Sequence, residues 1–568
     1  MAQVETGPPA DPAHLLRRLA AHPGAWAALA AGLALKAALL ATNSVTFNGD
    51  EAVLSLMARH ILRGEWPVFF WGQSYMGALD AYLRAAFFLA FGETILAGRL
   101  LQIALFAGVV ATTYRLANRL SADRFAATAA SLLVAVPSVL FSLYTTAGIG
   151  NYVEVLLLNN IIWWIGWDRL AGRKQALGWA LLAGLLAGIG WWGMALIAVS
   201  AGPLTLLSIW PQRKRGANGQ HSTRAQALPW QGGAATALGF LLGSMPWWWA
   251  MINGSAAAVV AELTGARVAE VPTNGLGVIG QRIVSLVLFN LPALVGLRPP
   301  WSVDWIGLPL GLLVSGVAVV VLWQATRRAL SAAEPAERRM ALLTLIGGWG
   351  LVIGAFVFTR FGNDPTGRYL VHLYPPLAIL TGDWLARLKQ RALLSRRPAL
   401  QGSALAALLA LILGFNLWGN LQAMIHNPPG LTTQFDLISH LPHEYDAPLI
   451  DFLDSIGADR GYSNSWVTFR FAFLTHERIV FSPRLPYKAD LSYTSLDDRY
   501  PPYSEAVAAA DRVVYVTSNL PALDEVLRQR FTTLGVSYRE GHIGPYTVFY
   551  DLTRHVTPEE IGPFDDQR

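Results

Sequence analysis

The stretch AWAALAAGLALKAALLATNSVTFNGDEAVLSLMARHILR, residues 25–63, carries the feature on which the fold prediction rests. Residues 25–42 form an apolar run of about the 20 residues that a helix needs to cross a membrane. Shortly after it, Asp50 and Glu51 open a segment, 50–63, in which apolar residues recur at helical spacing. The sequence therefore predicts a spanning helix followed by a short amphipathic helix that begins with two carboxylates.

The composition of the whole chain indicates a polytopic α-helical membrane protein. Of its 568 residues 53% are hydrophobic and 14% are charged, and the mean hydropathy is +0.38. Soluble proteins carry about 25% charged residues, so this chain has too few charges to cover the surface of a soluble protein of its size. The absence of Cys excludes disulfides and thiolate metal sites.

Ten apolar runs contain eleven candidate membrane spans. The run 176–210 is too long for one crossing, because a helix rises about 1.5 Å per residue and the hydrocarbon core is about 30 Å thick. Basic residues flank this run at both ends, so we expect two short spans that meet near Trp191 and Trp192. The other candidates are 25–42, 95–118, 125–146, 151–170, 232–252, 305–324, 340–359, 369–388 and 403–420.

The basic residues predict the orientation of these spans. With eleven spans every basic cluster falls on one side, which the positive-inside rule identifies as the cytoplasm. The expected localisation is the plasma (inner) membrane, with residues 1–24 in the cytoplasm. The basic excess is then a topology signal and does not indicate nucleic-acid binding. The clusters are Arg17–Arg18, Arg115–Arg124, Arg169–Lys174, Arg213–Arg224, Arg327–Arg339 and Arg387–Arg397.

Charge and pattern also divide the chain into two domains. Residues 1–420 carry 31 basic and 17 acidic side chains, whereas 421–568 carry 12 basic and 20 acidic ones. In the tail, β-rich runs at 512–518 and 546–552 accompany helical runs at 505–510 and 521–531. We expect a transmembrane domain at 25–420, with a large first outer loop at 43–94 and an outer loop at 253–304, and an extracytoplasmic soluble α/β domain at 421–568.

Ionisable residues gather near the predicted outer face, where their cost in the membrane marks them as site candidates. The sequence leaves two interpretations of Asp50 open, a helix cap and a catalytic carboxylate. Arg84 and Arg99 could instead snorkel to the interface, where Trp66 and Trp71 are also expected. Asp50 and Glu51 point about 100° apart on a helix, so they do not by themselves predict a metal site. The candidate substrate-binding residues are Gln73, Tyr75, Arg84, Arg99, Glu154, Arg368, Tyr369 and His372.

The run from Phe47 to Arg99, with GDEA, then HILRGEWPVFFWGQSYMGALDAYL and a closing GRL, resembles the first outer loop of GT-C glycosyltransferases. The similarity is to bacterial members of the dolichyl-phosphate-mannose protein mannosyltransferase type (glycosyltransferase family 39), and GRYLVHLYPPLAIL at 367–380 also fits. Many relatives carry Lys-Pro-Pro where this chain has residues 72–77, GQSYMG, so the identity of the sugar does not follow from the resemblance.

The resemblance implies inverting transfer of a sugar from a polyprenyl-phosphate-linked donor at the outer face. The acceptor would be a hydroxyl of a lipid, glycan or protein, and no cofactor is implied. Asp50 would be the general base and Glu51 would orient the acceptor or Asp50. Arg368, Arg84 or Arg99 would receive the charge of the leaving phosphate.

Two other functions stay open from the sequence. A transporter or flippase would place charges midway across the membrane. Asp383, in the inner half of the tenth predicted span, either is such a residue or caps or pairs near the cytoplasm. A non-catalytic subunit of an envelope-polysaccharide machine would keep the fold without the reaction. Loss of function in Asp50→Asn would argue against the second alternative.

Overall fold

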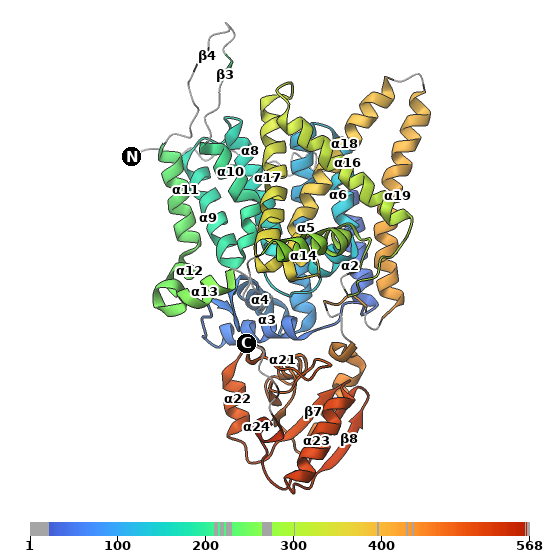
Figure 1. Ribbon diagram of the computed structural model, residues 1–568. Helices are drawn as coiled ribbons and strands as arrows, with labels where there is room; N and C mark the ends of the chain where they lie inside the picture. The colour runs from blue at the N-terminus through green and yellow to red at the C-terminus, as the bar shows by residue number, and fades with distance from the viewer. Residues whose placement is uncertain are drawn as a thin grey trace.

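A computed structural model describes residues 22–209, 214–215, 221–222, 230–263, 275–299, 301–394, 397–427, 430–433, 437–562 and 564. The predicted clusters Arg17–Arg18 and Arg213–Arg224 lie wholly or mostly outside these residues. The molecule has two parts, a bundle of long helices and an α/β unit attached to one end of the bundle (Figure 1).

The first half of the bundle follows the predicted spans with two interruptions. The predicted span 125–146 is broken after Ala135, because Pro137 disfavours helical geometry at the residue before it. The run 176–210 forms two helices separated near Gly193, as predicted. The elements are α2 Pro23–Ala41, α3 Gly49–Leu62, β1 Phe69–Phe70, β2 Gln73–Gly77, α4 Leu79–Phe91, α5 Ile95–Ser121, α6 Arg124–Ala135, α7 Val139–Tyr144, α8 Tyr152–Leu170, α9 Leu177–Gly193, η1 Ala195–Ile197, α10 Ala198–Ile209, β3 Lys214–Arg215, β4 His221–Ser222, α11 Trp230–Gly243 and α12 Met245–Ala250.

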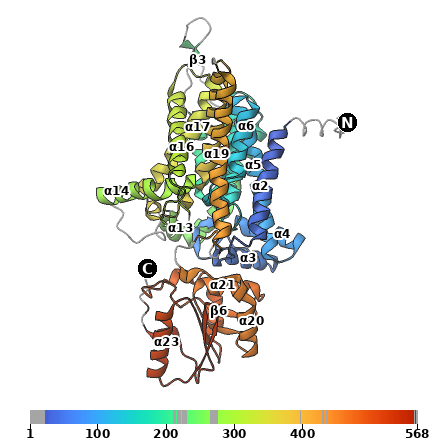
Figure 2. The ribbon, with the colours of Figure 1, turned by 90° about the vertical axis from the view of Figure 1, so that its right-hand side faces the viewer.

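The second half contains helices where a loop was expected. The predicted outer loop 253–304 includes a helical run over 276–295, and its first helix, α14, crosses the bundle at a steep angle to the long helices (Figures 1 and 2). The elements are η2 Met251–Ser255, α13 Ala256–Leu263, α14 Leu276–Ser285, η3 Leu286–Asn290, α15 Leu291–Val295, α16 Leu310–Leu330, α17 Ala336–Phe358, η4 Arg360–Asn363, η5 Arg368–Leu373, α18 Tyr374–Leu393 and α19 Pro398–Ile425.

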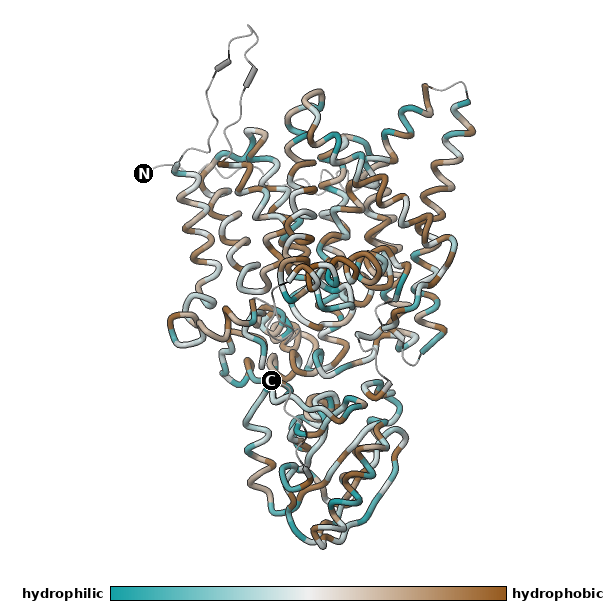
Figure 3. The backbone as a smooth tube through the Cα atoms, viewed as in Figure 1, coloured by the Kyte–Doolittle hydropathy of each residue, from teal (hydrophilic) through white to brown (hydrophobic). Residues whose placement is uncertain are grey.

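The bundle has the hydropathy of a multi-pass membrane protein. Among the described residues, six helical segments are long and apolar enough to cross a membrane. Figure 3 shows the apolar residues concentrated along the bundle, whereas polar and apolar residues are mixed in the α/β unit. The six segments are α2, α5, the run 276–295, α16, α17 and α19.

Glycines allow two of the shorter helices, α9 and α11, to pack backbone against backbone. A Cβ atom added to Gly184 of α9 would lie 2.0 Å from the carbonyl oxygen of Thr236. On α11, a Cβ atom added to Gly243 would lie 2.2 Å from the carbonyl oxygen of Leu185. Small residues four apart on facing helices are a common basis of close packing in membranes.

Ion pairs join the predicted basic clusters at the end of the bundle far from the α/β unit (Figure 1). Arg119 lies 3.3 Å from Asp168 and 3.0 Å from Glu337. Asp383 lies 2.6 Å from Arg328 at the same end. The residue that suggested a charge midway across the membrane is therefore part of this terminal network.

The α/β unit is built on one five-stranded sheet with strand order β6-β5-β7-β9-β8. β5 is parallel to β6 and β7, while β9 is antiparallel to β7 and β8. The strand and helix runs predicted from the sequence correspond to β7, β9, α22 and α23. The elements are η6 Leu437–Ser439, η7 His443–Tyr445, α20 Asp446–Ser455, β5 Arg460–Tyr462, α21 Ser465–Leu474, β6 Val480–Ser482, η8 Ser495–Asp497, α22 Pro501–Ala508, β7 Val514–Ser518, α23 Pro521–Thr533, β8 Arg539–Ile543, β9 Tyr546–Tyr550 and α24 Pro558–Ile561.

Helix α21 attaches this unit to the outer-loop helix α3, as both ribbon views show (Figures 1 and 2). The ring of Phe473 lies 5.5 Å from that of Phe47, and both side chains are buried in the core of the bundle. Trp71 is 9% exposed and its ring stacks on that of Tyr500 at 4.0 Å, so it packs inside the protein. Trp66, at 75% exposed, has the accessibility that its expected place at the membrane interface requires.

Candidate functional site

The start of helix α3 separates the two predicted acidic residues. Asn48 is the cap of α3, because its Oδ1 accepts a hydrogen bond of 3.0 Å from the backbone N–H of Glu51. The interpretation of Asp50 as the helix cap is therefore wrong. The Asp50 side chain is 24% exposed, whereas that of Glu51 is fully buried, so the neighbours occupy different environments.

Glu51 forms a buried ion pair with Arg99 of α5. Nε and Nη2 of Arg99 donate to the two carboxylate oxygens of Glu51 at 2.8 and 2.7 Å. The backbone N–H of Gly148 also donates to Glu51 at 3.4 Å. Both oxygens are thus engaged inside the protein, and the pair fixes α3 to α5. Arg99 is 5% exposed and does not snorkel.

A second buried network joins α4, α5 and α8 beneath the loop. Asp80 accepts from Arg84 at 3.2 Å and from Gln102 at 3.0 Å, and Gln102 also donates to Glu154 at 3.3 Å. The side chains of Asp80 and Arg84 are fully buried, so the snorkelling expected of Arg84 is wrong. Asn151 completes the network by accepting from the backbone N–H of Asp80 at 2.8 Å. These contacts hold the loop in place.

Asp50 is paired with a residue from the α/β unit. Nη1 of Arg499 lies 2.5 Å from Oδ1 of Asp50, and the Arg499 side chain is 13% exposed. The Arg499 guanidinium also lies 5.5 Å from the centre of the Phe70 ring. Among the described residues, Arg499 supplies the ion-pair contact of Asp50. Asp50, the member of the predicted acidic pair that is partly exposed, is therefore in contact with the α/β unit.

A second cation lies at the entrance of α18. Arg368 pairs with Asp364 at 2.6 Å and stands 4.9 Å from the centre of the Tyr369 ring. Its side chain is 33% exposed. The other oxygen of Asp364 accepts from the backbone and side chain of Thr366 at 2.7 and 2.5 Å, so the loop that presents Arg368 is internally braced.

Tyr75 of β2 connects the two cations. Burial raises the pKa of the Tyr75 phenol, and the charges of Arg368, Asp50 and Arg499 all act on it. The phenol therefore lies within electrostatic range of both Arg368 and the Asp50–Arg499 pair. Oε1 of Gln73, two residues earlier, is buried and accepts no hydrogen bond from the described residues.

Aromatic rings form one side of this region. Phe361 lies 6.4 Å from Tyr75 and 4.7 Å from Tyr369, measured between ring centres. His372 is buried, with its ring 6.1 Å from that of Tyr152. The structure thus brings together Asp50, Tyr75, Arg368 and Tyr369 from the predicted set, whereas it places Arg84, Arg99 and Glu154 in buried networks.

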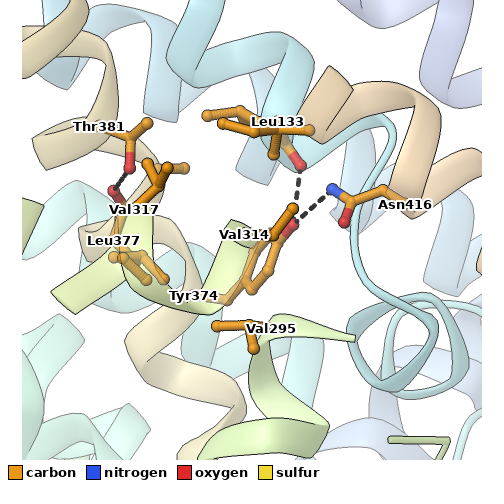
Figure 4. Close-up of a pocket in the computed structure, with 11 residues that line it drawn as sticks. Leu133, Val295, Val314, Val317, Tyr374, Leu377, Thr381 and Asn416 are labelled. Carbon is orange, nitrogen blue, oxygen red and sulfur yellow. Dashed lines mark hydrogen bonds between the residues drawn. The ribbon is translucent and has the colours of Figure 1, made fainter. Parts of the chain in front are cut away.

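A cavity among α6, α16, α18 and α19 offers no acid–base chemistry. Its lining is mostly aliphatic, with Tyr374, Asn416 and Thr381 as its polar side chains (Figure 4). The Tyr374 hydroxyl donates to the Leu133 carbonyl at 3.2 Å and accepts from Asn416 at 3.1 Å. No charged residue lines it. Within the described part of the chain, no group of three or more His, Asp or Glu could hold a metal ion.

The arrangement of the chain matches solved structures of membrane glycosyltransferases. ArnT from Cupriavidus metallidurans bound to undecaprenyl phosphate is 14% identical, with a TM-score of 0.57 over 93% of this chain and 97% of that one. The same protein in the apo state gives 12% identity and 0.55 over 91% and 97%. The chain has the GT-C fold.

A more distant likeness is to the oligosaccharyltransferase of Archaeoglobus fulgidus in the apo form. That chain is 12% identical, with a TM-score of 0.49 over 87% of this chain and 69% of that one. No family profile and no curated protein matches the sequence. The predicted GT-C architecture of a multi-pass membrane protein is thus confirmed by shape, and the family 39 type stays a prediction.

Sequence reasoning missed three residues of the site region. Arg499 and Tyr500 lie in the tail, and Asn151 carries no charge. Asp50 and Arg499 are 449 positions apart, so no local pattern relates them. The remaining signal was the run LDDRYPPY at 496–503, in which one Arg and aromatic residues stand within an acidic tail.

Proposed function

We propose that the protein is a membrane glycosyltransferase that moves a sugar from a polyprenyl-phosphate-linked donor to an acceptor hydroxyl, with inversion at the anomeric carbon. The observation that carries this proposal is the partly exposed carboxylate of Asp50 at the start of α3, beside Arg499 and near the Tyr75 phenol that Arg368 also influences. The GT-C fold supports it, as does the binding of undecaprenyl phosphate by ArnT, a protein of similar fold.

Each residue has a separate role in the proposed reaction. Asp50 takes the proton of the acceptor hydroxyl as the hydroxyl oxygen attacks the anomeric carbon. The bond from that carbon to the phosphate oxygen breaks, and polyprenyl phosphate leaves with the bonding electrons. Arg368 receives the growing negative charge on the phosphate, as a preorganised cation can. Glu51 holds Arg99 and thereby fixes the helix that presents Asp50.

The remaining predicted residues contribute to binding or to shape. Gln73, Tyr75 and Tyr369 are suited to the sugar, because aromatic faces and unpaired amide oxygens are common contacts in ligand sites. His372 supports the aromatic side of the site. Arg84 and Glu154 belong to the framework beneath the loop rather than to the substrate contacts. The acceptor is a lipid, glycan or protein.

We place the reaction at the extracytoplasmic face of the inner membrane. Asp50 lies at the end of the bundle that carries the α/β unit, and the ion-paired basic clusters lie at the other end. Under the positive-inside rule the basic end is cytoplasmic. Residues 421–568, including the α/β unit, then stand outside the membrane above the site.

The test is transfer of label from radiolabelled polyprenyl-phosphate sugars by the full chain in proteoliposomes. We expect wild-type transfer to fall about 100- to 10,000-fold in Asp50→Asn, the range of a general base. The matched control is Asp454→Asn, because Asp454 is an acid 42% exposed that pairs with Arg478 on the α/β unit. Its activity should equal that of the wild type.

The outcomes separate the alternatives. Equal transfer by wild type and Asp50→Asn would exclude Asp50 as the base. Absence of transfer by both proteins with every donor, together with movement of labelled lipid across the bilayer, would favour the transporter function instead.

A further inference from the structure

Arg499 differs from Arg99 in how it is held. Arg99 donates through two nitrogens to the two oxygens of a fully buried carboxylate. Arg499 donates through Nη1 to one oxygen of Asp50, whose side chain is 24% exposed. An ion pair with one such hydrogen bond and a partly hydrated partner is easier to exchange than a buried pair with two.

The backbone around Arg499 is firmly seated on the outer loop. A Cβ atom added to Gly72, whose φ is +71°, would lie 2.9 Å from Cγ of Arg499 and 3.1 Å from its Cα. The next residue, Tyr500, stacks on Trp71 at 4.0 Å with an angle of 18° between the rings. The segment is therefore fixed beside the site, and the guanidinium at the end of the side chain reaches Asp50.

The acidic groups around Arg499 keep its side chain positively charged. Asp50, Asp497 and the Tyr487 phenol act on it and raise its pKa against the opposing effect of burial, so the side chain stays charged. The charges of Arg499 and Arg368 both act on the Tyr75 phenol. A phosphate entering between them would compete with Asp50 for the Arg499 guanidinium.

We propose that Arg499 is a phosphate-binding residue supplied by the α/β unit: it pairs with Asp50, and its guanidinium moves to the donor phosphate when the donor binds. The proposal rests on the proposed function, because it names the residue that links donor binding to the release of the base. The exchange forms and breaks no covalent bond. Asp50 then meets the acceptor hydroxyl without a cation on its oxygen, and the site is activated by the donor itself.

The test measures binding, so it does not depend on catalysis. The equilibrium affinity of the full chain in nanodiscs for undecaprenyl phosphate is compared among wild type, Asp50→Asn, Arg499→Ala and the double variant. We expect Arg499→Ala to bind about 10- to 100-fold more weakly, as loss of a charge-assisted hydrogen bond implies. Asp50→Asn should bind more tightly than wild type, because the competing carboxylate is gone.

The double variant distinguishes competition from simple repulsion. If Asp50 competes for Arg499, the tightening caused by Asp50→Asn is present with Arg499 and absent from the Arg499→Ala background. The same tightening in both backgrounds would mean that Asp50 merely repels the phosphate, and the proposal would fail. Unchanged affinity in Arg499→Ala would overturn it as well.

The controls separate this proposal from folding and from the proposed function. Arg478→Ala removes an arginine 52% exposed that pairs with Asp454 within the α/β unit, and its affinity should match that of the wild type. Arg499→Lys, which keeps the charge, should recover part of the affinity. If no glycosyl transfer were detected but the binding pattern held, the phosphate site would stand and the reaction assignment would fall.

Discussion

Replacement of Arg99 by Met tests whether Glu51 is a structural anchor. The Arg99 and Glu51 side chains are 6% and 0% exposed, and the guanidinium donates to both carboxylate oxygens. In Arg99→Met, Glu51 keeps only the N–H of Gly148 at 3.4 Å among these contacts. A buried charge left without its partner costs about 3–5 kcal/mol, so the free energy of unfolding should fall by about that amount.

The measurement is a denaturant titration of the full chain in mixed lipid–detergent micelles, followed by tryptophan fluorescence. Arg478→Met is the comparison, because Arg478 and Asp454 are 52% and 42% exposed and an exposed pair contributes about 0–1 kcal/mol. The double variant Glu51→Gln with Arg99→Met should recover most of the loss, since it removes the unpaired charge. If Arg99→Met costs no more than Arg478→Met, the assignment of Glu51 as an anchor is refuted.

Two further predictions concern pH and helix packing. Burial opposes the shift, but pairing with Glu477 and Glu65 raises the pKa of His60. The stability that protonated His60 contributes is therefore fully present below pH 6.5, its ordinary pKa, and is lost as the pH rises through the raised pKa. Burial alone would raise the pKa of Glu477, but His60 lowers it to about 2. The stability that ionised Glu477 contributes is therefore fully present above pH 4.5 and is lost as the pH falls toward 2. Attachment of the α/β unit should thus be tightest between pH 4.5 and 6.5. In the wild type, the hydrogen-exchange rate of α21, corrected for intrinsic rates, should increase when the pH is raised above 6.5. The same increase in His60→Gln would contradict the assignment. Gly184→Val should separate α9 from α11, since a Cβ there would lie 2.0 Å from the Thr236 carbonyl oxygen, and a cysteine cross-link between the two helices should form more slowly than in Gly178→Val, a site with open space.

The sequence pattern predicted those helices that are determined by neighbouring residues. The apolar run before Asp50 and the helical spacing after it are properties of 39 consecutive residues, and α2 and α3 follow from them. The break in 176–210 followed from length alone. The segment 276–295 was missed, although it is apolar enough to span a membrane, because the alternation of basic clusters required no span there.

The candidate site could be predicted only in part, because its partners come from distant positions. Asp50 stood out as a charged residue after a span, but its accessibility depends on Asn48 taking the cap and on the burial of Glu51. Arg99 was found as an ionisable residue near the outer face and was predicted to contact the phosphate, whereas the structure places it in a bidentate contact with Glu51. Contacts of this kind are set by tertiary packing, which spacing in one sequence does not encode.

The distribution of partners among Glu51, Asp80 and Asp50 supports the proposal that Asp50 is the base. Glu51 and Asp80 are fully buried and are neutralised by arginines of the same helical bundle. Removing either partner would leave a charge in a dry interior, so these pairs stay closed through any catalytic cycle. Of these three acids, Asp50 alone is partly exposed, and it is paired with a residue of another domain. Movement of the Arg499 side chain, or a shift of the α/β unit, therefore changes the environment of the proposed base and leaves the framework that positions it intact.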